Sequence, residues 1–570
     1  MSTIAEKSAQ PPSSDISRVS AASREDDDHV PPAALPEASA STPKTARFWI
    51  VLTGLVVALF VAVLEGYAVS TALPVMVNDL HTDQFIWVAS TYAIVGTSLL
   101  PLVGGLTEAF GRKPVILGAL LLFMAGAAVC GSAPNISVLI AGRALHGAGA
   151  GGILSCTQIV LSDLVTLQER GTYNGLFGLV WAIGGGLGPL VGGALAKPTL
   201  WRWIFYLNIP IAGLAALVLL VFLDLPRPSS RSALDCLKSL DVIGNTLIIG
   251  ASCAIAIAIT WAGVQFPWSS AQVLAPLIIG GVSLVLWFVY ETRLATHPAV
   301  PMVILSNRTS LSGFVQIFVA AFINITLVYY LPVYYQACKD ASPIASGVDL
   351  LGLCFATGGF AILTGVSVAA LKRYRPQLWA SWALIMLGLG LLSSLTADSP
   401  RGASIGYQVL VGVGVGMVYS GGYFPVLAPL PATLNAPALA FYVFVRSFAQ
   451  IWGITVSGVL LQNTLAARLP PSVAALAPSG LANAAYTVVP LVSKLPQPER
   501  DETRAAFAAG LADVWRVALG AAAVGLLASV LMEGLPLHTE RDARWAARGA
   551  EPKGLGEEKA GDAEVQVVDT

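Results

Sequence analysis

The feature that most constrains this chain is a long series of apolar segments, each about as long as a membrane is thick. The chain has 570 residues, of which 55% are hydrophobic and only 11% are charged, whereas soluble domains carry about 25% charged residues. A helix needs about 20 apolar residues to cross a bilayer. We therefore predict an all-α, multi-pass membrane protein. The net charge of -1 says nothing about nucleic acid. Because no basic cluster suggests one, no nucleic-acid partner is expected.

The apolar segments suggest about fourteen membrane spans. They lie near residues 48–72, 85–106, 114–133, 136–160, 172–196, 203–223, 241–263, 273–290, 311–336, 346–370, 378–396, 404–428, 439–461 and 512–533. An even number of spans places both termini on one side of the membrane. The short loops on that side carry most of the Lys and Arg residues, which predicts that both termini are cytosolic. A plasma-membrane location is expected, with the vacuolar membrane as the alternative.

The chain is expected to have five parts. They are a disordered tail over 1–45, a six-helix half over 46–225, a linker with two extra spans over 226–300, a second six-helix half over 301–535, and a disordered tail over 536–570. Within the second half, residues 465–511 are expected to form a long outer loop. The Ala-rich, amphipathic pattern of this loop predicts a short helix at the membrane surface.

Two charged residues lie well inside predicted spans of the first half. Glu65 is in the first span and Arg143 is in the fourth. Charge in the middle of a span is costly, so such residues normally face a cavity or a partner. A carboxylate whose environment alternates between two sides of the membrane can carry a proton, because burial and a neighbouring cation shift its proton affinity in opposite directions. The alternative role for both residues is a structural ion pair.

A glycine-bounded loop with opposite charges follows the second span. Glu108, Arg112 and Lys113 lie close together there, and the turn is framed by Gly104 and Gly111. These charges can pair with each other or with helix ends. The alternative is an ordinary basic loop on the cytosolic side.

The segment 184–193 reads GGGLGPLVGG inside an apolar span. In a membrane, glycines allow neighbouring helices to approach closely. Pro189 in its middle predicts a kink. This span is therefore expected to be tightly packed and able to bend.

These segments resemble signatures of the major facilitator superfamily. The charged loop resembles the pattern GxLaDrxGrkxxL, with Glu108 in place of the usual Asp, and the stretch from Arg143 resembles RxxqGxgaa, with His146 in place of Gln. The glycine segment resembles gxxxGPxxGG. The matching positions are Gly104, Gly111, Arg112, Lys113, Arg143, Gly184, Gly188, Pro189, Gly192 and Gly193.

Further segments resemble the fourteen-span drug:proton antiporter branch, most closely its fungal members. The resemblance implies the major facilitator fold, with two six-helix halves and two extra central spans. It implies proton coupling at Glu65 and Arg143, and a conformational latch that combines the charged loop with Asp163 and Arg170. The glycine motif is associated with antiporters, which favours export.

Several polar and aromatic residues are candidates for a substrate cavity. They are Tyr67, His146, Gln158, Trp181, Asn208, Asn324, Tyr329, Tyr330 and Arg446. The alternative for the aromatic residues is a belt at the membrane interface. The alternative for Arg446 is structural pairing.

The resulting hypothesis is a proton-coupled secondary transporter that exports drugs, toxins or secondary metabolites. A proton-coupled transporter of basic amino acids or siderophores and a transport-dead sensor remain as alternatives, and sodium coupling stays open. No enzymatic activity, cofactor or metal is expected, since no Walker sequence or catalytic cluster occurs. The expected partners are a small molecule, protons and the lipid bilayer, and the expected state is a monomer.

Overall fold

A computed structural model describes residues 44–80, 85–197, 200–225, 240–263, 266–295, 298, 300–474, 488–489 and 491–537. Most of both predicted tails lies outside the described residues. The same holds for linker residues 226–239 and for residues 475–487 of the predicted outer loop. The surface helix expected in this loop therefore stays a prediction.

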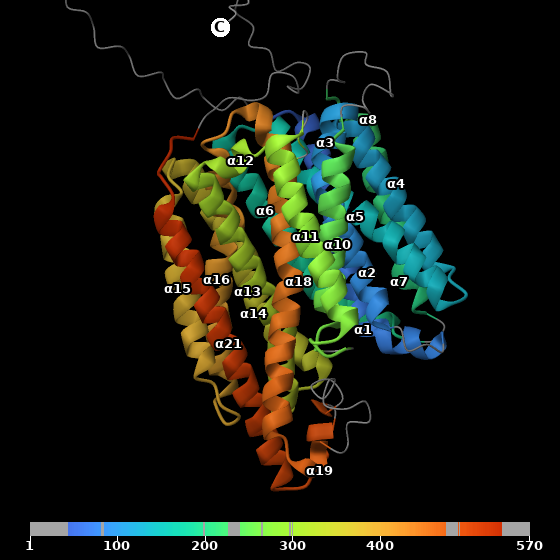
Figure 1. Cartoon of the computed structure of the whole chain (residues 1–570), viewed down its shortest axis with the longest axis vertical. Coiled ribbons are helices and arrows are strands. Elements are labelled where there is room, and N and C mark those ends of the chain that lie inside the picture. The colour runs from blue at the N-terminus through green and yellow to red at the C-terminus, as the bar shows by residue number, and fades with distance from the viewer. Residues whose placement is uncertain are drawn as a thin grey trace, which may run out of the picture. The chain divides into compact units, whose positions relative to one another are not determined.

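The described residues of the first half are helical along most of their length (Figure 1). The helices are α1 (Ala46–Asp79), α2 (Phe85–Ser98), α3 (Leu100–Phe110), α4 (Arg112–Gly131), α5 (Ile136–Leu164), α6 (Leu167–Leu195), α7 (Arg202–Tyr206) and α8 (Asn208–Phe222).

Two further helices connect the halves, and the second half follows. The connecting helices are α10 (Val242–Trp261) and α11 (Ala271–Arg293). The second half contains α12 (Val303–Ser306), α13 (Arg308–Lys339), α14 (Pro343–Leu371), α15 (Arg375–Ser393), α16 (Arg401–Gly421), α17 (Tyr423–Leu427), the short 3-10 helix η1 (Ala432–Leu434), α18 (Asn435–Arg468), α19 (Pro471–Ala474) and α21 (Glu499–Leu531).

The number of membrane helices agrees with the sequence. Within the described residues, 13 helices are long and apolar enough to cross a membrane, and the bent pair α2–α3 raises the total to 14. The predicted fold class is therefore confirmed. The pair bends by 46° at Leu99, where Pro101 lies in the first turn of α3. Proline has no backbone N–H to donate, so it fits the start of a new helix better than the interior of a continuous one.

Polar residues mark several helix starts. The Asn135 side chain accepts a hydrogen bond from the Val138 N–H at the start of α5. Thr166 and Glu169 form a reciprocal capping box at the start of α6. Such caps satisfy N–H groups that have no partner within the helix. These caps therefore fix the residues at which α5 and α6 begin.

Several pairs of helices join the two halves. Helix α6 packs against α14 of the other half as well as against α1, and α3 packs against α18. The two connecting helices α10 and α11, green in Figure 1, lie side by side, and α10 contacts both α2 and α18. The connecting pair therefore touches both halves.

The last membrane helix differs from its predicted bounds. We expected a span near 512–533 after a long outer loop, but α21 begins at Glu499. Its first turns carry Glu499, Asp501 and Glu502. Acidic residues stabilise a helix N-terminus through its dipole, so the helix extends beyond the apolar segment that hydropathy detects.

Candidate functional site

A buried carboxylate lies where α1, α5 and α8 meet. The Arg143 guanidinium donates through Nη1 to Glu65 Oε1 at 2.7 Å. The Asn208 amide donates to Glu65 Oε2 at 2.5 Å. Both Glu65 and Arg143 are 1% exposed. Each carboxylate oxygen thus accepts one hydrogen bond from a different helix, and the two charges neutralise each other.

Arg143 is also held on its other sides. Its Nε donates to the Val88 carbonyl at 2.8 Å, and its guanidinium lies 4.3 Å from the centre of the Tyr92 ring. The Tyr92 hydroxyl in turn donates to the Ala62 carbonyl at 2.8 Å. Arginine supplies several donors in a planar fork and stacks on aromatic rings, so this single side chain joins α1, α2 and α5.

His146 follows Arg143 by one helical turn and lies close to the Glu65 carboxylate. Its Nδ1 is 3.8 Å from Glu65 Oε1, and its ring centre is 4.1 Å from that of Phe123. The side chain is fully buried and does not line either cavity described below. The structure therefore groups His146 with the carboxylate rather than with the substrate-cavity candidates.

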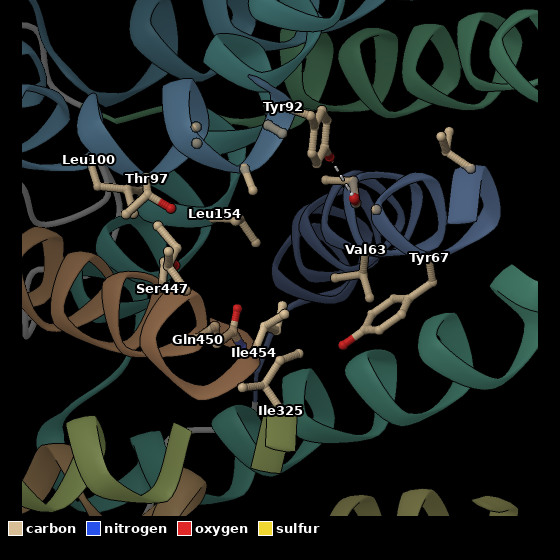
Figure 2. Close-up of a pocket in the computed structure, with 18 of the residues that line it drawn as sticks. Val63, Tyr67, Tyr92, Thr97, Leu100, Leu154, Ile325, Ser447, Gln450 and Ile454 are labelled. Carbon is tan, nitrogen blue, oxygen red and sulfur yellow. Dashed lines mark hydrogen bonds between the residues drawn. The ribbon is translucent and has the colours of Figure 1, made fainter. Parts of the chain in front are cut away.

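A cavity of about 190 Å³ lies between the two halves, beside the buried pair. Side chains from both halves converge on it, with Tyr67 and Tyr92 on one side and Ser447 and Gln450 on the other (Figure 2). Most of its walls are aliphatic or aromatic. Of the residues predicted to line a cavity or couple protons, it contains Tyr67, Arg143, Trp181 and Tyr329.

A second, smaller cavity adjoins the first. Its volume is about 20 Å³, roughly one water molecule. It brings together the predicted residues Gln158, Trp181 and Arg446. The Arg446 guanidinium lies 4.9 Å from the centre of the Trp181 ring. Trp181 lines both cavities, whereas Arg446 lines the smaller one.

The remaining predicted cavity residues have other positions. Asn208 binds Glu65, as described above. Tyr330 is buried, and its hydroxyl donates to the Ile454 carbonyl at 2.7 Å. Asn324 faces the Tyr419 hydroxyl. Tyr330 and Asn324 therefore connect helices of the second half.

The charged loop forms a compact network at the predicted cytosolic end. Arg112 is buried and donates through Nε to Asp163 Oδ2 at 2.9 Å, through Nη1 to the Thr107 carbonyl at 2.9 Å, and through Nη2 to Glu108 Oε1 at 3.2 Å. Gly111, just before it, has a φ of 89°, a conformation that side chains other than glycine rarely adopt. The turn thereby directs Arg112 back onto α5.

The other predicted latch residues lie near this network. Arg170 is buried and donates to the Ser162 carbonyl at 3.0 Å. Lys113 follows Arg112 and is half-buried. Gly104 lies against the second half, since a Cβ added there would be 3.1 Å from the Ala440 Cβ of α18. The network thus borders the contact between the halves.

The glycine motif packs α6 directly onto α1. A Cβ added at Gly184 would lie 2.9 Å from a Val63 methyl group, and one added at Gly188 would lie 2.5 Å from the Tyr67 Cβ. Gly192 is also buried, whereas Gly193 faces open space. The side chain of Pro189 lies outside the described residues, although its backbone is helical. These glycines thus bring α6 against the turn of α1 that carries Glu65.

Sequence reasoning did not single out several polar residues of this region. Gln450 and Ser447 line the larger cavity, and Asn174 and Tyr423 line the smaller one. Gln450 could have been found from its spacing, because it lies one helical turn after Arg446 and therefore on the same face. Hydropathy does not show which way a helix is rotated, so it could not place Ser447, Asn174 and Tyr423 at a cavity.

Comparison with known proteins identifies relatives over nearly the whole chain. The family model of the Major Facilitator Superfamily matches residues 55–454. "Efflux pump FUS6" of Gibberella moniliformis is 33% identical over 519 residues, which are 90% of this chain and 92% of that protein. "MFS-type transporter gkaD" of Penicillium citrinum is 35% identical over 89% of this chain and 88% of its own length. "MFS-type efflux pump MMF1" of Mycosarcoma maydis is 32% identical over 88% of this chain and 82% of its own length.

Solved structures share the fold at low sequence identity. The human organic anion transporter MFSD10 (TETRAN) has a TM-score of 0.52 at 14% identity, covering 84% of this chain and 100% of that chain. The proton:xylose symporter XylE has a TM-score of 0.53 at 12% identity, covering 86% of this chain and 98% of that chain. The chain is a multi-pass membrane protein, and with a family match over most of its length it belongs to the major facilitator superfamily.

Proposed function

We propose that this protein is a proton-coupled exporter of small organic molecules, such as drugs, toxins or secondary metabolites, that works by alternating access. Two of the relatives described above are named efflux pumps, which supports export over nutrient uptake. The observation that carries proton coupling is the fully buried Glu65, paired with Arg143 beside the cavity between the halves. Members of this superfamily are in general not enzymes, and we assign none of these residues to catalysis.

In the proposed cycle, a proton binds Glu65 on Oε1, the oxygen that accepts from Arg143. Protonation removes the negative charge and weakens this contact. The Arg143 guanidinium then relies on the Val88 carbonyl and the Tyr92 ring. Because an unpaired buried charge is costly, the two protonation states favour different arrangements of α1, α2 and α5. Proton release restores the ion pair.

Close contacts between the halves support a state that is closed at the predicted cytosolic end. Gly171 and Gly365 meet backbone to backbone, since a Cβ added at Gly171 would lie 2.6 Å from the Gly365 carbonyl oxygen. Gly104 lies close to Pro437 and Ala440. We assign the Arg112 network to holding this closed state, as a latch. Its release opens the cavity to the cytosol.

The glycine motif is proposed to couple protonation of Glu65 to opening of the contact between the halves. Gly184 and Gly188 contact α1 next to Glu65, whereas Gly171 and Gly175 of the same helix contact α14. A tilt of α6 therefore changes both the packing around the carboxylate and the contact between the halves. We further propose a monomer in the plasma membrane with cytosolic termini.

Proton-driven transport is tested in inside-out membrane vesicles whose interior is acidified. Transport is followed as uptake of labelled toxins and drugs, and as proton release measured with a pH-sensitive acridine dye. We expect Glu65→Gln to abolish gradient-driven uptake, because the amide cannot exchange the proton. Glu502→Gln is the matched control, since Glu502 is exposed on α21, and it is expected to transport normally.

A Glu65→Gln protein that is folded, inserted in the membrane and still takes up the panel compounds in response to the gradient would disprove the assigned role of Glu65. If the unaltered protein moves none of these compounds with or without a gradient, the proposed export function itself fails. Glutamine keeps an acceptor for Arg143, so thermal unfolding of the purified variant checks that the loss is not a loss of folding.

A further inference from the structure

Arg446 is a buried cation in the middle of a membrane helix. It lies on α18 and is 8% exposed. Its guanidinium lies 4.9 Å from the centre of the Trp181 ring and 5.9 Å from that of the Tyr419 ring. These rings belong to α6 of the first half and α16 of the second. The cation is therefore held between the two halves by aromatic faces.

Unlike Arg143 and Arg112, Arg446 has no acidic partner among the described residues. Arg143 pairs with Glu65 and Arg112 pairs with Asp163, but no carboxylate of the described residues lies within ion-pairing distance of Arg446. Cation–π contacts offset only part of the cost of burying a charge. Because Glu65 and Arg143 neutralise each other, no carboxylate of the described residues is left to balance the charge of Arg446.

The surroundings of Arg446 are suited to hold a polar group. The smaller cavity is lined by its guanidinium and by side chains that donate hydrogen bonds, those of Gln158, Asn174, Tyr423 and Tyr442. Apart from Arg446, no charged side chain lines it among the described residues. An anion placed there meets a cation and several donors, with no like charge nearby.

The larger cavity next to it is suited to an apolar body. Val63, Leu154, Ile325 and Ile451 contribute to its wall. Gln450 lines this cavity one helical turn after Arg446, and Trp181 borders both cavities. A rotation of the Trp181 side chain would join the two spaces and expose the guanidinium to a molecule in the larger cavity.

We propose that Arg446 binds an anionic group, a carboxylate or enolate, of the exported molecule, and that the apolar part of this molecule occupies the larger cavity. This inference rests on the proposed function, and it names the class of substrate as amphipathic organic anions. Arginine matches a carboxylate with two parallel hydrogen bonds. The bound anion supplies the negative charge that none of the described residues places beside Arg446.

The test compares two fluorescent probes that differ in one charge, a diethylaminocoumarin carboxylate and its neutral ethyl ester. Binding to the purified full-length protein is titrated by fluorescence. We expect the unaltered protein to prefer the carboxylate, and Arg446→Gln to weaken carboxylate binding by about tenfold or more with little change for the ester. Arg468→Gln is the matched control, because Arg468 is an exposed arginine at the end of the same helix, and it is expected to bind both probes normally.

If Arg446→Gln does not fold, Arg446→Lys replaces it. Lysine keeps the charge but not the fork, so carboxylate binding should fall several-fold while ester binding stays the same. The inference is overturned if the unaltered protein binds neither probe or binds both equally, or if the folded variant retains full carboxylate affinity.

Vesicle uptake separates this inference from the proposed function. In one outcome, Arg446→Gln loses carboxylate binding, but the pH gradient has no effect on uptake by the unaltered protein. This outcome would support the anion site and refute proton-coupled export. In the opposite outcome, the gradient drives uptake of the ester and the carboxylate at equal rates, and Arg446→Gln leaves both rates unchanged. This outcome would support export and refute the anion site.

Discussion

At the scale of single residues, the protein places arginines in contrasting surroundings. Arg112 is buried and donates to three acceptors at once, one of them the Asp163 carboxylate. Arg308 forms an ion pair with Glu533, but its side chain is 70% exposed. A buried charge that loses its partners destabilises a protein by several kcal/mol, about 3–5 kcal/mol, whereas an exposed pair contributes about 0–1 kcal/mol.

Arg112→Lys should therefore destabilise the protein. A lysine ammonium cannot reach Asp163, Glu108 and the Thr107 carbonyl from one position as the guanidinium does, and the expected loss is about 2 kcal/mol or more. The measurement is the apparent Tm of the purified protein in detergent. Arg308→Lys is the control for the same substitution in an exposed pair, and its Tm should stay nearly unchanged. Equal Tm values for the two variants would contradict the assigned role of Arg112.

At the scale of elements, α6 uses glycines on two sides. Near its outer part, Gly184 and Gly188 pack against α1, and near its start, Gly171 and Gly175 pack against α14. Without a hydrophobic driving force between helices in lipid, close backbone approach is a main source of helix association. This helix is thus fitted to both halves along its length.

Gly188→Leu should impair transport strongly, because any side chain there overlaps Tyr67, and a leucine requires α1 and α6 to separate. Gly193→Leu places the same side chain on the same helix at a position where an added Cβ would meet no other helix of the described residues within 4 Å. We expect transport to be lost in the first variant and retained in the second. Flux is measured at matched amounts of protein in the membrane, and full activity of Gly188→Leu would refute the packing role.

At the scale of the whole molecule, the larger cavity is formed by the two halves together. The larger cavity takes its wall from α1, α2, α3, α5 and α6 of the first half and from α13 and α18 of the second. The backbone contact between Gly171 and Gly365 lies toward the predicted cytosolic end. Alternating access requires such contacts to form and break.

Gly365→Val should therefore hold the halves apart at this end, because a side chain at Gly365 would overlap the Gly171 carbonyl. We expect lower flux and faster labelling of a cysteine introduced by Asn174→Cys, in the smaller cavity, by an impermeant maleimide added from the cytosolic side. Gly359→Val is the control on the same helix, since the added Cβ would meet no other helix within 4 Å in the part of the chain that the structure describes. Unchanged labelling in Gly365→Val would argue against closure at this contact.

Much of the fold follows from the sequence because the backbone of a span must satisfy its own hydrogen bonds in lipid. Unsatisfied N–H and C=O groups are too costly in hydrocarbon, so each apolar segment of sufficient length must become a helix. The all-α class and the helix count were predicted on this basis, whereas the major facilitator fold was implied by the resemblance of sequence motifs. The early start of α21 was not predicted, since residues from Glu499 onward are polar and their helix is stabilised by its N-terminal charges.

By itself, the sequence determined the spans, the charges that lie inside them and the glycine-rich helix, because the cost of polar groups in a membrane is a local property. Only the tertiary structure decided that Glu65 meets Arg143, 78 positions later, and that Arg446 rests on Trp181 without an acidic partner among the described residues. These contacts depend on how each helix is rotated and which helices become neighbours. Packing over the whole bundle sets both, and no single span encodes it.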